Sequence, residues 1–210
     1  MSYATLDPQK TAVYFHDMLN VYVRSSPERE RETAIAVANS VKLRKAAKAA
    51  GALVCYVGGS LRPDGMDMPR VYTDTDHQLK PWKDAERQHA NLRPLAVAGT
   101  QNAQIIDELA PDEDDYVLRK HRWSGLFQTP LELSLRTRGV DTMILCGGLV
   151  SSGLASTACS ALDRDFNLVI AKDCCTWHVE GELDFFMTEV FPRMGRVRTA
   201  DEVIAMFRSV

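Results

Sequence analysis

Short apolar segments alternate along this chain with longer segments in which apolar residues recur at helical spacing. The apolar segments are rich in β-branched and aromatic residues, a composition typical of buried strands. They predict strands over Thr11–His16, Ala52–Val57, Asp115–Arg119, Thr142–Cys146, Asn167–Ala171 and Val197–Arg198. The helical spacing predicts helices over Pro27–Ala50, Gln101–Leu109, Thr129–Arg138, Ser152–Asp163, Glu180–Val190 and Ala200–Arg208.

Six apolar strands separated by helices favour an α/β fold, in which helices cover both faces of a mainly parallel sheet. No linker, internal repeat or low-complexity tract interrupts the pattern, so we expect one domain over residues 1–210. Residues 58–98 are different, because they hold three prolines before Pro94, few apolar runs and many charges. They predict a long loop with room for a short helix, and loops of this kind often act as lids.

The composition narrows the class of protein. Of the 210 residues, 45% are hydrophobic and 25% are charged, as is ordinary for a soluble globular protein. The net charge of −3 and the pI of about 6.0 give no reason to expect nucleic acid or an anionic membrane as a partner. No apolar run approaches the ~20 residues of a membrane span, and the N-terminal residues lack the apolar core of a signal peptide. The five cysteines are odd in number and lie in apolar settings, which favours reduced thiols in the cytoplasm.

Three of the predicted strand ends carry residues suited to chemistry. The first strand runs into Asp17, the third is followed by Lys120, and the fourth leads into a glycine turn that contains Gly153. The carboxyl ends of parallel strands share one edge of the sheet, where α/β proteins bind ligands. An aspartate after a strand is also a common turn former, a lysine is often solvated, and paired glycines often form only a tight turn. The coincidence of all three at one edge nevertheless favours a functional site.

The same residues lie in segments that resemble the isochorismatase-like hydrolases, which include nicotinamidases, ureidoacrylate and carbamoyl amidohydrolases, and isochorismatases. The resemblance covers nearly the whole chain and is carried by AVYFHDM, KHRWSGLFQTPLELSLRTRGV and GGLVSSGLASTACSALDRDFNLVIAKDCC. It implies a three-layer α/β/α sandwich around a six-stranded, mainly parallel, Rossmann-like sheet. It also implies hydrolysis of a small molecule, with Asp17 and Lys120 as catalytic residues.

One position departs from the amidohydrolases of this superfamily. Their nucleophilic cysteine aligns with Gly153, and Cys159 lies nearly two helical turns further on, too far to replace it. Four explanations remain open. The first is that the chain is an isochorismatase-type enzyme, since these enzymes also carry glycine here. The second is an inert Cys→Gly variant of a cysteine amidohydrolase. The third is an enzyme in which Ser151 or Ser152 is the nucleophile, and the fourth is a non-catalytic binding relative.

The isochorismatase-type explanation implies cleavage of a vinyl ether, which needs no thiolate. Protonated Asp17 would act as a general acid toward the enol carbon with Lys120 assisting, and water would then add to the oxocarbenium carbon. Gly153 would leave room for substrate or water. Isochorismate carries two carboxylates, for which the candidate cations are Arg62, Arg70, Arg87 and Arg122.

Further binding residues are expected near the same edge. The candidates that contact substrate are Arg122 and Trp123 after the lysine, Leu149 and Val150 in the glycine turn, and Trp177 after the fifth strand. The spacing of Asp74, Asp76, His77 and His89 does not match a metal site, and GxGxxG and Walker patterns are absent, so neither a metal nor a nucleotide cofactor is expected. Members of the superfamily often form dimers or tetramers, which implies a homo-oligomer.

Overall fold

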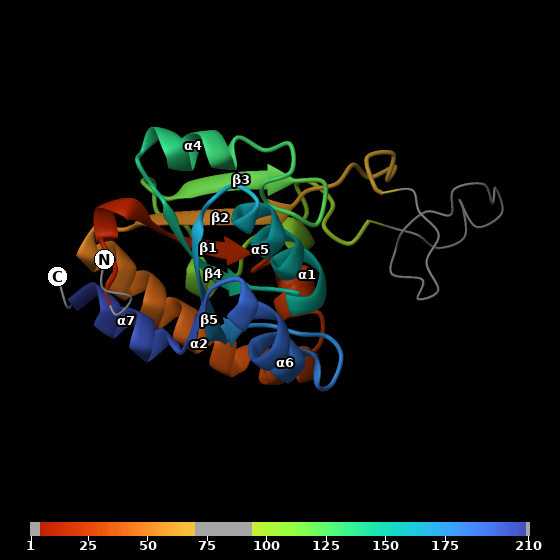
Figure 1. Cartoon of the computed structure of the whole chain (residues 1–210). Helices are drawn as coiled ribbons and strands as arrows, with labels where there is room; N and C mark the ends of the chain where they lie inside the picture. The colour runs from red at the N-terminus through yellow and green to blue at the C-terminus, as the bar shows by residue number, and fades with distance from the viewer. Residues whose placement is uncertain (1–4, 70–93, 209–210) are drawn as a thin grey trace.

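The centre of the fold is a six-stranded sheet in which all paired strands are parallel (Figure 1). The computed structural model describes residues 5–69 and 94–208. The spatial order of the strands is β3-β2-β1-β4-β5-β6. Their bounds are β1 Thr11–His16, β2 Leu53–Gly59, β3 Tyr116–Lys120, β4 Thr142–Gly147, β5 Asn167–Cys175 and β6 Arg196–Arg198. The α/β fold with a mainly parallel sheet that the sequence predicts is therefore confirmed.

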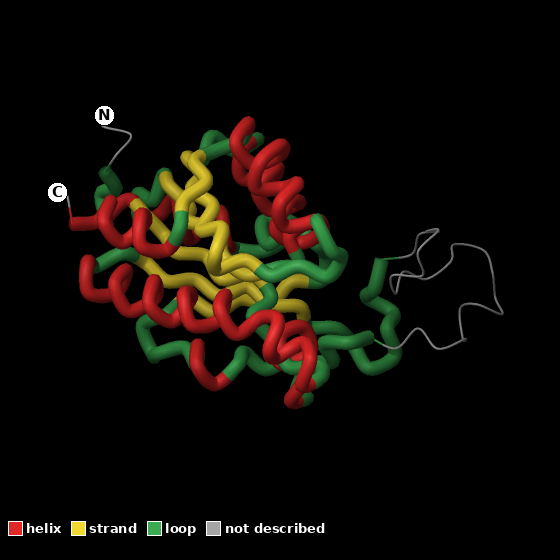
Figure 2. Tube along the Cα trace, turned by 90° about the horizontal axis from the view of Figure 1, so that it is seen from below, coloured by secondary structure: helices red, strands yellow, loops and turns green. Residues whose placement is uncertain are grey.

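Helices cover both faces of the sheet (Figure 2). One face packs against α2 (Pro27–Ala50) and α7 (Ala200–Arg208), and the other packs against α4 (Leu131–Thr137) and α5 (Ala155–Leu162). Two short helices, α1 (Asn20–Val23) and α6 (Glu182–Phe185), follow β1 and β5. The result is the three-layer α/β/α arrangement that the family resemblance implies.

Strand β1 lies between β2 and β4, where the chain changes direction across the sheet. All six of its residues are buried, and their side chains alternate between the two cores. Val13 and Phe15 pack with α2 and α7, whereas Ala12 and Tyr14 pack with α4 and α5. Ligands of α/β proteins bind beyond the carboxyl ends of the strands at such a reversal of strand order.

Helix α2 is the longest helix in the described part of the chain, and its ends carry recognisable signals. The Ser26 side chain accepts a hydrogen bond from the Arg29 backbone N–H, and Pro27 occupies the first turn. Gly51 ends the helix with a φ of 84°, a left-handed conformation that favours glycine. These signals explain why the predicted bounds of this helix are correct.

The helix predicted over residues 101–109 is wrong. Two separate 3₁₀ turns, Gln101–Ala103 and Asp107–Leu109, stand there instead. Between them the chain is extended, because it pairs with the segment after β1: the Ile106 N–H donates to the Met18 carbonyl, and the Asn20 N–H donates to the Gln104 carbonyl. Tertiary pairing has overridden the local helical spacing.

The helix predicted over residues 180–190 is also only partly correct, because α6 covers Glu182–Phe185 and a wider π-helical turn covers Phe186–Val190. Most of the predicted lid, residues 70–93, lies outside the described residues. The adjoining residues Leu61 and Val97 form a parallel bridge. None of the helices in residues 5–69 and 94–208 has the length and apolar character of a membrane span.

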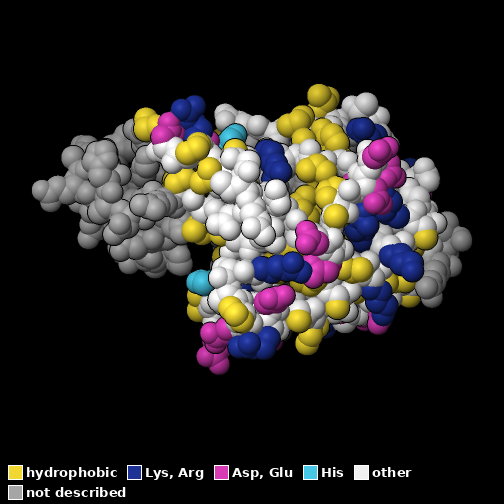
Figure 3. Space-filling view, turned by 180° about the vertical axis from the view of Figure 1, so that it is seen from behind, with side chains coloured by type: hydrophobic (Ala, Val, Ile, Leu, Met, Phe, Trp, Pro, Cys, Tyr) yellow, Lys and Arg dark blue, Asp and Glu magenta, His cyan; other side chains and the backbone are white. Residues whose placement is uncertain are grey.

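Charged side chains of both signs lie close together on one face of the molecule (Figure 3). On the face that Figure 3 shows, Lys and Arg lie among Asp and Glu. One such cluster joins Arg44 and Lys48 of α2 to Asp112, Asp114 and Asp115 before β3.

Leu43→Ala should destabilise the protein by about 2–5 kcal/mol, because Leu43 of α2 is fully buried against the sheet and the truncation leaves a cavity. Ile35→Ala on the same helix is the matched control, since that side chain is 73% exposed and its loss should change stability by less than about 0.5 kcal/mol. Urea denaturation of the two variants measures both values. Equal losses would show that α2 does not pack on the sheet through Leu43.

Candidate functional site

Asp17 is the first residue after β1, and the backbone turns sharply there. Its φ of 46° lies in the left-handed region that non-glycine residues rarely adopt, although aspartate tolerates it better than most. Its N–H donates to the carbonyl of Val57 at 3.1 Å, which holds the turn against β2. Unusual backbone conformations of this kind concentrate at functional sites.

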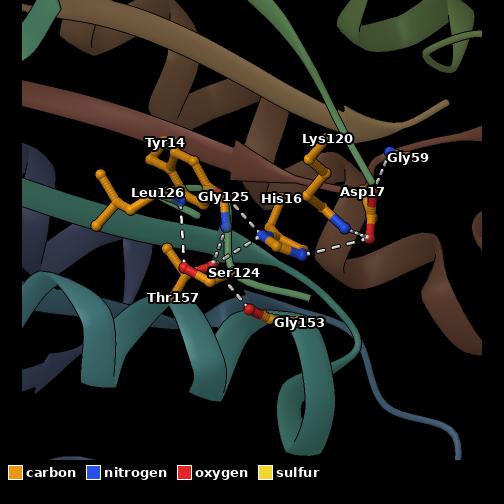
Figure 4. Close-up of polar contacts among 10 residues, drawn as sticks. All are labelled: Tyr14, His16, Asp17, Gly59, Lys120, Ser124, Gly125, Leu126, Gly153 and Thr157. Atoms are coloured by element: carbon orange, nitrogen blue, oxygen red, sulfur yellow. Dashed lines mark hydrogen bonds and ion pairs between the residues drawn. The ribbon is translucent and has the colours of Figure 1, made fainter. Parts of the chain in front are cut away.

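The Asp17 carboxylate is buried among donors from two neighbouring strands (Figure 4). Oδ1 accepts a hydrogen bond from the backbone N–H of Gly59 at the end of β2, at 2.7 Å. Oδ2 accepts one from Nζ of Lys120, the last residue of β3, also at 2.7 Å. Asp17 is 8% exposed and Lys120 5% exposed. The structure thus brings together two of the residues that the sequence singles out, because only β2 separates the carboxyl ends of β1 and β3.

The charge of Asp17 is set by its neighbours. Burial by itself raises the pKa of the carboxyl group, but the ammonium of Lys120 and the imidazole of His16 together lower it by more. The pKa of Asp17 is therefore held well below its ordinary value, and the carboxylate is ionised at neutral pH. A buried ion pair of this kind is costly to break, because either partner alone would be a buried uncompensated charge.

His16 is fully buried on the side of the sheet that faces α5. Its Nδ1 lies 2.6 Å from the Tyr14 hydroxyl oxygen and 3.3 Å from Oγ1 of Thr157. Its Nε2 lies 3.3 Å from Oδ2 of Asp17, close enough for attraction but not aligned as a good hydrogen bond. Burial first, and the charge of Lys120 second, lower the pKa of His16 below its ordinary value of about 6.5, so the imidazole is neutral near pH 7.

The imidazole of His16 fills the space beside Gly153. A Cβ at position 153 would lie 2.1 Å from His16 Nε2, and 2.9 and 3.1 Å from two ring carbons. The prediction that Gly153 leaves room for substrate or water is therefore wrong for this form of the protein. A second glycine is matched in the same way, because a Cβ on Gly125 would lie 1.9 Å from the Tyr14 hydroxyl oxygen.

Thr157 of α5 ties the two glycine segments together behind the imidazole. Its Oγ1 accepts a hydrogen bond from the Gly125 N–H at 3.0 Å and donates one to the Gly153 carbonyl at 2.8 Å. The turn that leads into α5 and the loop after β3 are thereby fixed relative to the end of β1.

The predicted binding residues fall into two groups. Trp123 is 50% exposed and lines a cleft of about 370 Å³ together with Pro69, Arg122, Ser124, Phe127, Ser156 and Ser160. Leu149 and Trp177 are half-buried, whereas Val150 is fully buried in the core that contains Leu154. Ser124 of this cleft accepts a hydrogen bond from the Leu126 N–H, and the next residue, Gly125, donates to Thr157 (Figure 4).

The candidate cations differ in what they already bind. Arg62 is paired with Asp64, whereas Arg122 donates to the backbone carbonyls of Asp67 and His121. Within residues 5–69 and 94–208, no carboxylate is paired with the guanidinium of Arg122. Arg70, Arg87, Asp74, Asp76, His77 and His89 lie outside the described residues.

Sequence reasoning missed Tyr14 and His16. The available signal was two polar side chains at a spacing of two residues on a strand that is otherwise apolar, immediately before Asp17. A buried polar residue is informative because it needs a partner, whereas a buried apolar residue does not. The partners, however, are separated from β1 by more than a hundred residues, so the sequence alone does not reveal them.

Comparison with known proteins shows the family of this chain. The model of the isochorismatase domain matches residues 11–202. The chain belongs to the isochorismatase family. It is 27% identical over 200 residues to the phenazine biosynthesis protein PhzD1 of Pseudomonas aeruginosa, a match that covers 95% of this chain and 87% of that protein.

Two further proteins are similar to this chain. The uncharacterized isochorismatase family protein YecD of Escherichia coli is 38% identical over 96 residues, which cover 46% of this chain and only 51% of that protein. The structure of a cysteine hydrolase from Pseudomonas syringae superposes with a TM-score of 0.80 at 26% identity, over 97% of this chain and 95% of that one. The chain thus shares its family with these relatives and its fold with a cysteine hydrolase.

Gly153→Ala should destabilise the protein by about 1–3 kcal/mol, because the new Cβ overlaps the His16 imidazole. Gly59→Ala is the matched control: it adds a Cβ beside Asp17, but its nearest neighbour there is at 3.5 Å, an ordinary contact. Thermal and urea unfolding of both variants give the comparison. If Gly153→Ala proves as stable as the wild type, the imidazole does not occupy that space.

His16 should also contribute to the loss of stability on mild acidification. Because its pKa is lowered in the folded protein, the unfolded chain binds a proton more readily below pH 6.5, and stability falls as the pH falls. Between pH 7 and pH 5 the wild type should lose up to about 2 kcal/mol more than His16→Gln. Urea denaturation at both pH values measures the difference, and the four other histidines are common to both proteins. An identical pH dependence would mean that His16 is not buried as a neutral group.

Proposed function

We propose that this chain is a thiol-independent, isochorismatase-type hydrolase of a small anionic molecule, with Asp17 as the residue that transfers the proton. The observation that carries the proposal is the His16 imidazole in the place of a side chain at position 153. A cysteine there would require the ring to leave a fully buried site in which its Nδ1 is hydrogen-bonded to Tyr14. The surroundings of position 153 have space for glycine and not for a larger side chain. This argues against an inert variant of a cysteine amidohydrolase.

A serine nucleophile is a weaker alternative. The Ser151 N–H donates to Oε1 of Glu182 at 2.7 Å, and the side chain is exposed. Among the described residues, no hydrogen bond joins the hydroxyl of Ser151 or Ser152 to Asp17 or His16, which would have to activate it.

The substrate has to change the charge state of Asp17 before this residue donates a proton. In the free protein the carboxylate is ionised, mainly because Lys120 offsets the effect of burial. A substrate carboxylate that pairs with the Lys120 ammonium would neutralise that charge and add a negative charge beside Asp17. Both effects raise the pKa of Asp17, so an anionic substrate promotes protonation of its own acid catalyst.

The proposed reaction balances without a covalent intermediate. The proton of Asp17 adds to the enol carbon of a vinyl ether and leaves an oxocarbenium ion, to whose carbon water adds. The added water returns one proton to the Asp17 carboxylate. The hemiketal then breaks its C–O bond to the alcohol, with its hydroxyl proton passing to the departing oxygen. The products are a ketone and an alcohol.

A second reaction class is favoured by the same ionised carboxylate. As a base, Asp17 would take a proton from the water that attacks an amide carbon and would pass it to the departing nitrogen, so that the C–N bond breaks to an acid and an amine without a thioester. Similarity in fold to a cysteine hydrolase supports this alternative. Similarity to PhzD1 over nearly its whole length, a protein named for the biosynthesis of a small molecule, supports the first. A relative that only binds its ligand would catalyse neither reaction.

The half of the site that holds the rest of the substrate is proposed to include the cleft beside Trp123. Arg122 offers a cation to a second carboxylate, and the indole of Trp123 offers an apolar wall. Leu149, Trp177 and Val150 border the same edge, with Val150 as support from the core.

Asp17→Asn should reduce hydrolysis by about 10²–10⁴-fold in either scheme, because it removes the proton-transfer group. Wild type, Asp17→Asn and the exposed control Asp107→Asn are compared on isochorismate and on small amides, with products detected by mass spectrometry. The pH profile separates the two schemes: activity falls with rising pH if Asp17 is the acid and rises with pH if it is the base. Near-normal kcat in Asp17→Asn would exclude Asp17 from both roles, and no turnover by the wild type would favour the binding relative.

A further inference from the structure

We propose that His16 is a positioning residue for Asp17. Its imidazole takes the place of the side chain that Gly153 lacks and directs an Nε2–H group at the Asp17 carboxylate. The role in hydrolysis rests on the proposed function, whereas the geometry and the tautomer do not.

The position of the ring is fixed from three sides. His16 is the last residue of β1, and its backbone carbonyl accepts a hydrogen bond from the Gly148 N–H at 3.0 Å. Its Nδ1 meets the Tyr14 hydroxyl at 2.6 Å, and its Nε2 lies over Gly153. Tyr14 and His16 project from the same face of β1, and each occupies the Cβ position of a glycine, Gly125 for Tyr14 and Gly153 for His16. Because this packing against glycine occurs twice, with different residues, it indicates a specific arrangement of the site.

The contact between Nε2 and the Asp17 carboxylate selects the tautomer, because the contacts of Nδ1 allow it either to accept from Tyr14 or to donate to Thr157. Thr157 donates its hydroxyl proton to the Gly153 carbonyl, so its oxygen is only an acceptor toward the rest of the network. Burial keeps the Tyr14 hydroxyl protonated, since its pKa is raised well above the ordinary value. If Tyr14 donates to Nδ1, the proton of the neutral ring resides on Nε2 and faces the Asp17 carboxylate. The other tautomer would place the Nε2 lone pair 3.3 Å from a carboxylate oxygen, which is repulsive.

The Nε2–H group completes the set of donors around Asp17. Oδ1 already accepts from the Gly59 N–H, and Oδ2 accepts from Lys120 Nζ. The charge of Asp17 acts in turn on two tyrosines: after burial, it raises the pKa of Tyr14 and, from α1, of Tyr22. Nε2 is buried and has no aligned hydrogen-bond partner among the described residues, so the Asp17 oxygen at 3.3 Å is the acceptor that its proton faces.

A matched pair of variants separates hydrogen bonding from space filling. His16→Gln keeps an amide N–H at about the reach of Nε2, and His16→Leu has a similar volume with no donor. In the wild type, long-range ¹H–¹⁵N spectra should show the Nε2–H tautomer of His16 at neutral pH, assigned by its loss in His16→Gln. The amide proton of Gly59 reports on its hydrogen bond to Asp17. Its chemical shift should change in His16→Leu and stay near the wild-type value in His16→Gln.

Kinetics on the substrate that the wild type turns over give the second readout. His16→Leu should lower kcat by about 10–100-fold with little change in KM, because a misplaced catalytic group affects the reaction more than binding. Loss of the donor also raises the pKa of Asp17, so the limb of the pH profile that Asp17 governs should move to higher pH. His16→Gln should restore both values to near those of the wild type.

The outcomes keep the two proposals apart. An Nδ1–H tautomer, an imidazolium at neutral pH, or a Gly59 amide shift unchanged in His16→Leu would overturn the positioning role, whether or not the protein hydrolyses anything. An unchanged kcat and pH profile in His16→Leu would overturn it as well. If the spectra agree with the proposal and the wild type turns over no substrate, the positioning of Asp17 stands and the proposed hydrolysis fails.

Discussion

The buried carboxylate of Asp17 is the constraint on which the rest of the site depends. An ionised carboxylate with 8% exposure requires compensation, and the fold supplies it from three residues at the ends of three strands. Lys120 provides the charge, Gly59 a backbone donor and His16 a neutral ring. A change in strand order or register would separate these groups. The chemistry of the site therefore depends on the topology of the sheet.

In this arrangement the ion pair between Asp17 and Lys120 sets the protonation state of the Asp17 carboxyl group. The attraction of Lys120 keeps Asp17 ionised in the free protein, and a ligand that competes for the ammonium alters the carboxyl group directly. Burial makes this coupling strong, because charges in a medium of low polarity interact over short distances with little screening. A neutral ligand does not pair with the Lys120 ammonium and leaves Asp17 ionised. The charge of the substrate therefore decides whether Asp17 acts as an acid or as a base.

Sequence patterns predicted the sheet and three of the central positions for clear reasons. Buried parallel strands are continuously apolar, and their carboxyl ends share an edge, so Asp17, Lys120 and Gly153 were identifiable from their places after β1, β3 and β4. The sequence does not show which side chain packs against a glycine in the interior. The partner of Gly153 comes from a strand more than a hundred residues away, and the expectation of empty space there was wrong for that reason. The segment over residues 101–109 was misread because its backbone pairs with residues 18–20, which helical spacing does not report.

The central claim is that hydrolysis proceeds without a covalent enzyme intermediate, because His16 stands where a thiol would be. The most direct test is a single-turnover reaction with a substrate that the protein hydrolyses, quenched rapidly at successive times. Intact-protein mass spectrometry then measures the mass of the protein at each time. The account predicts the mass of the unmodified 23.4 kDa chain at every time point, with product formed at the rate of substrate loss. A transient adduct whose mass equals the acyl portion of the substrate, rising and decaying before product release, would contradict it.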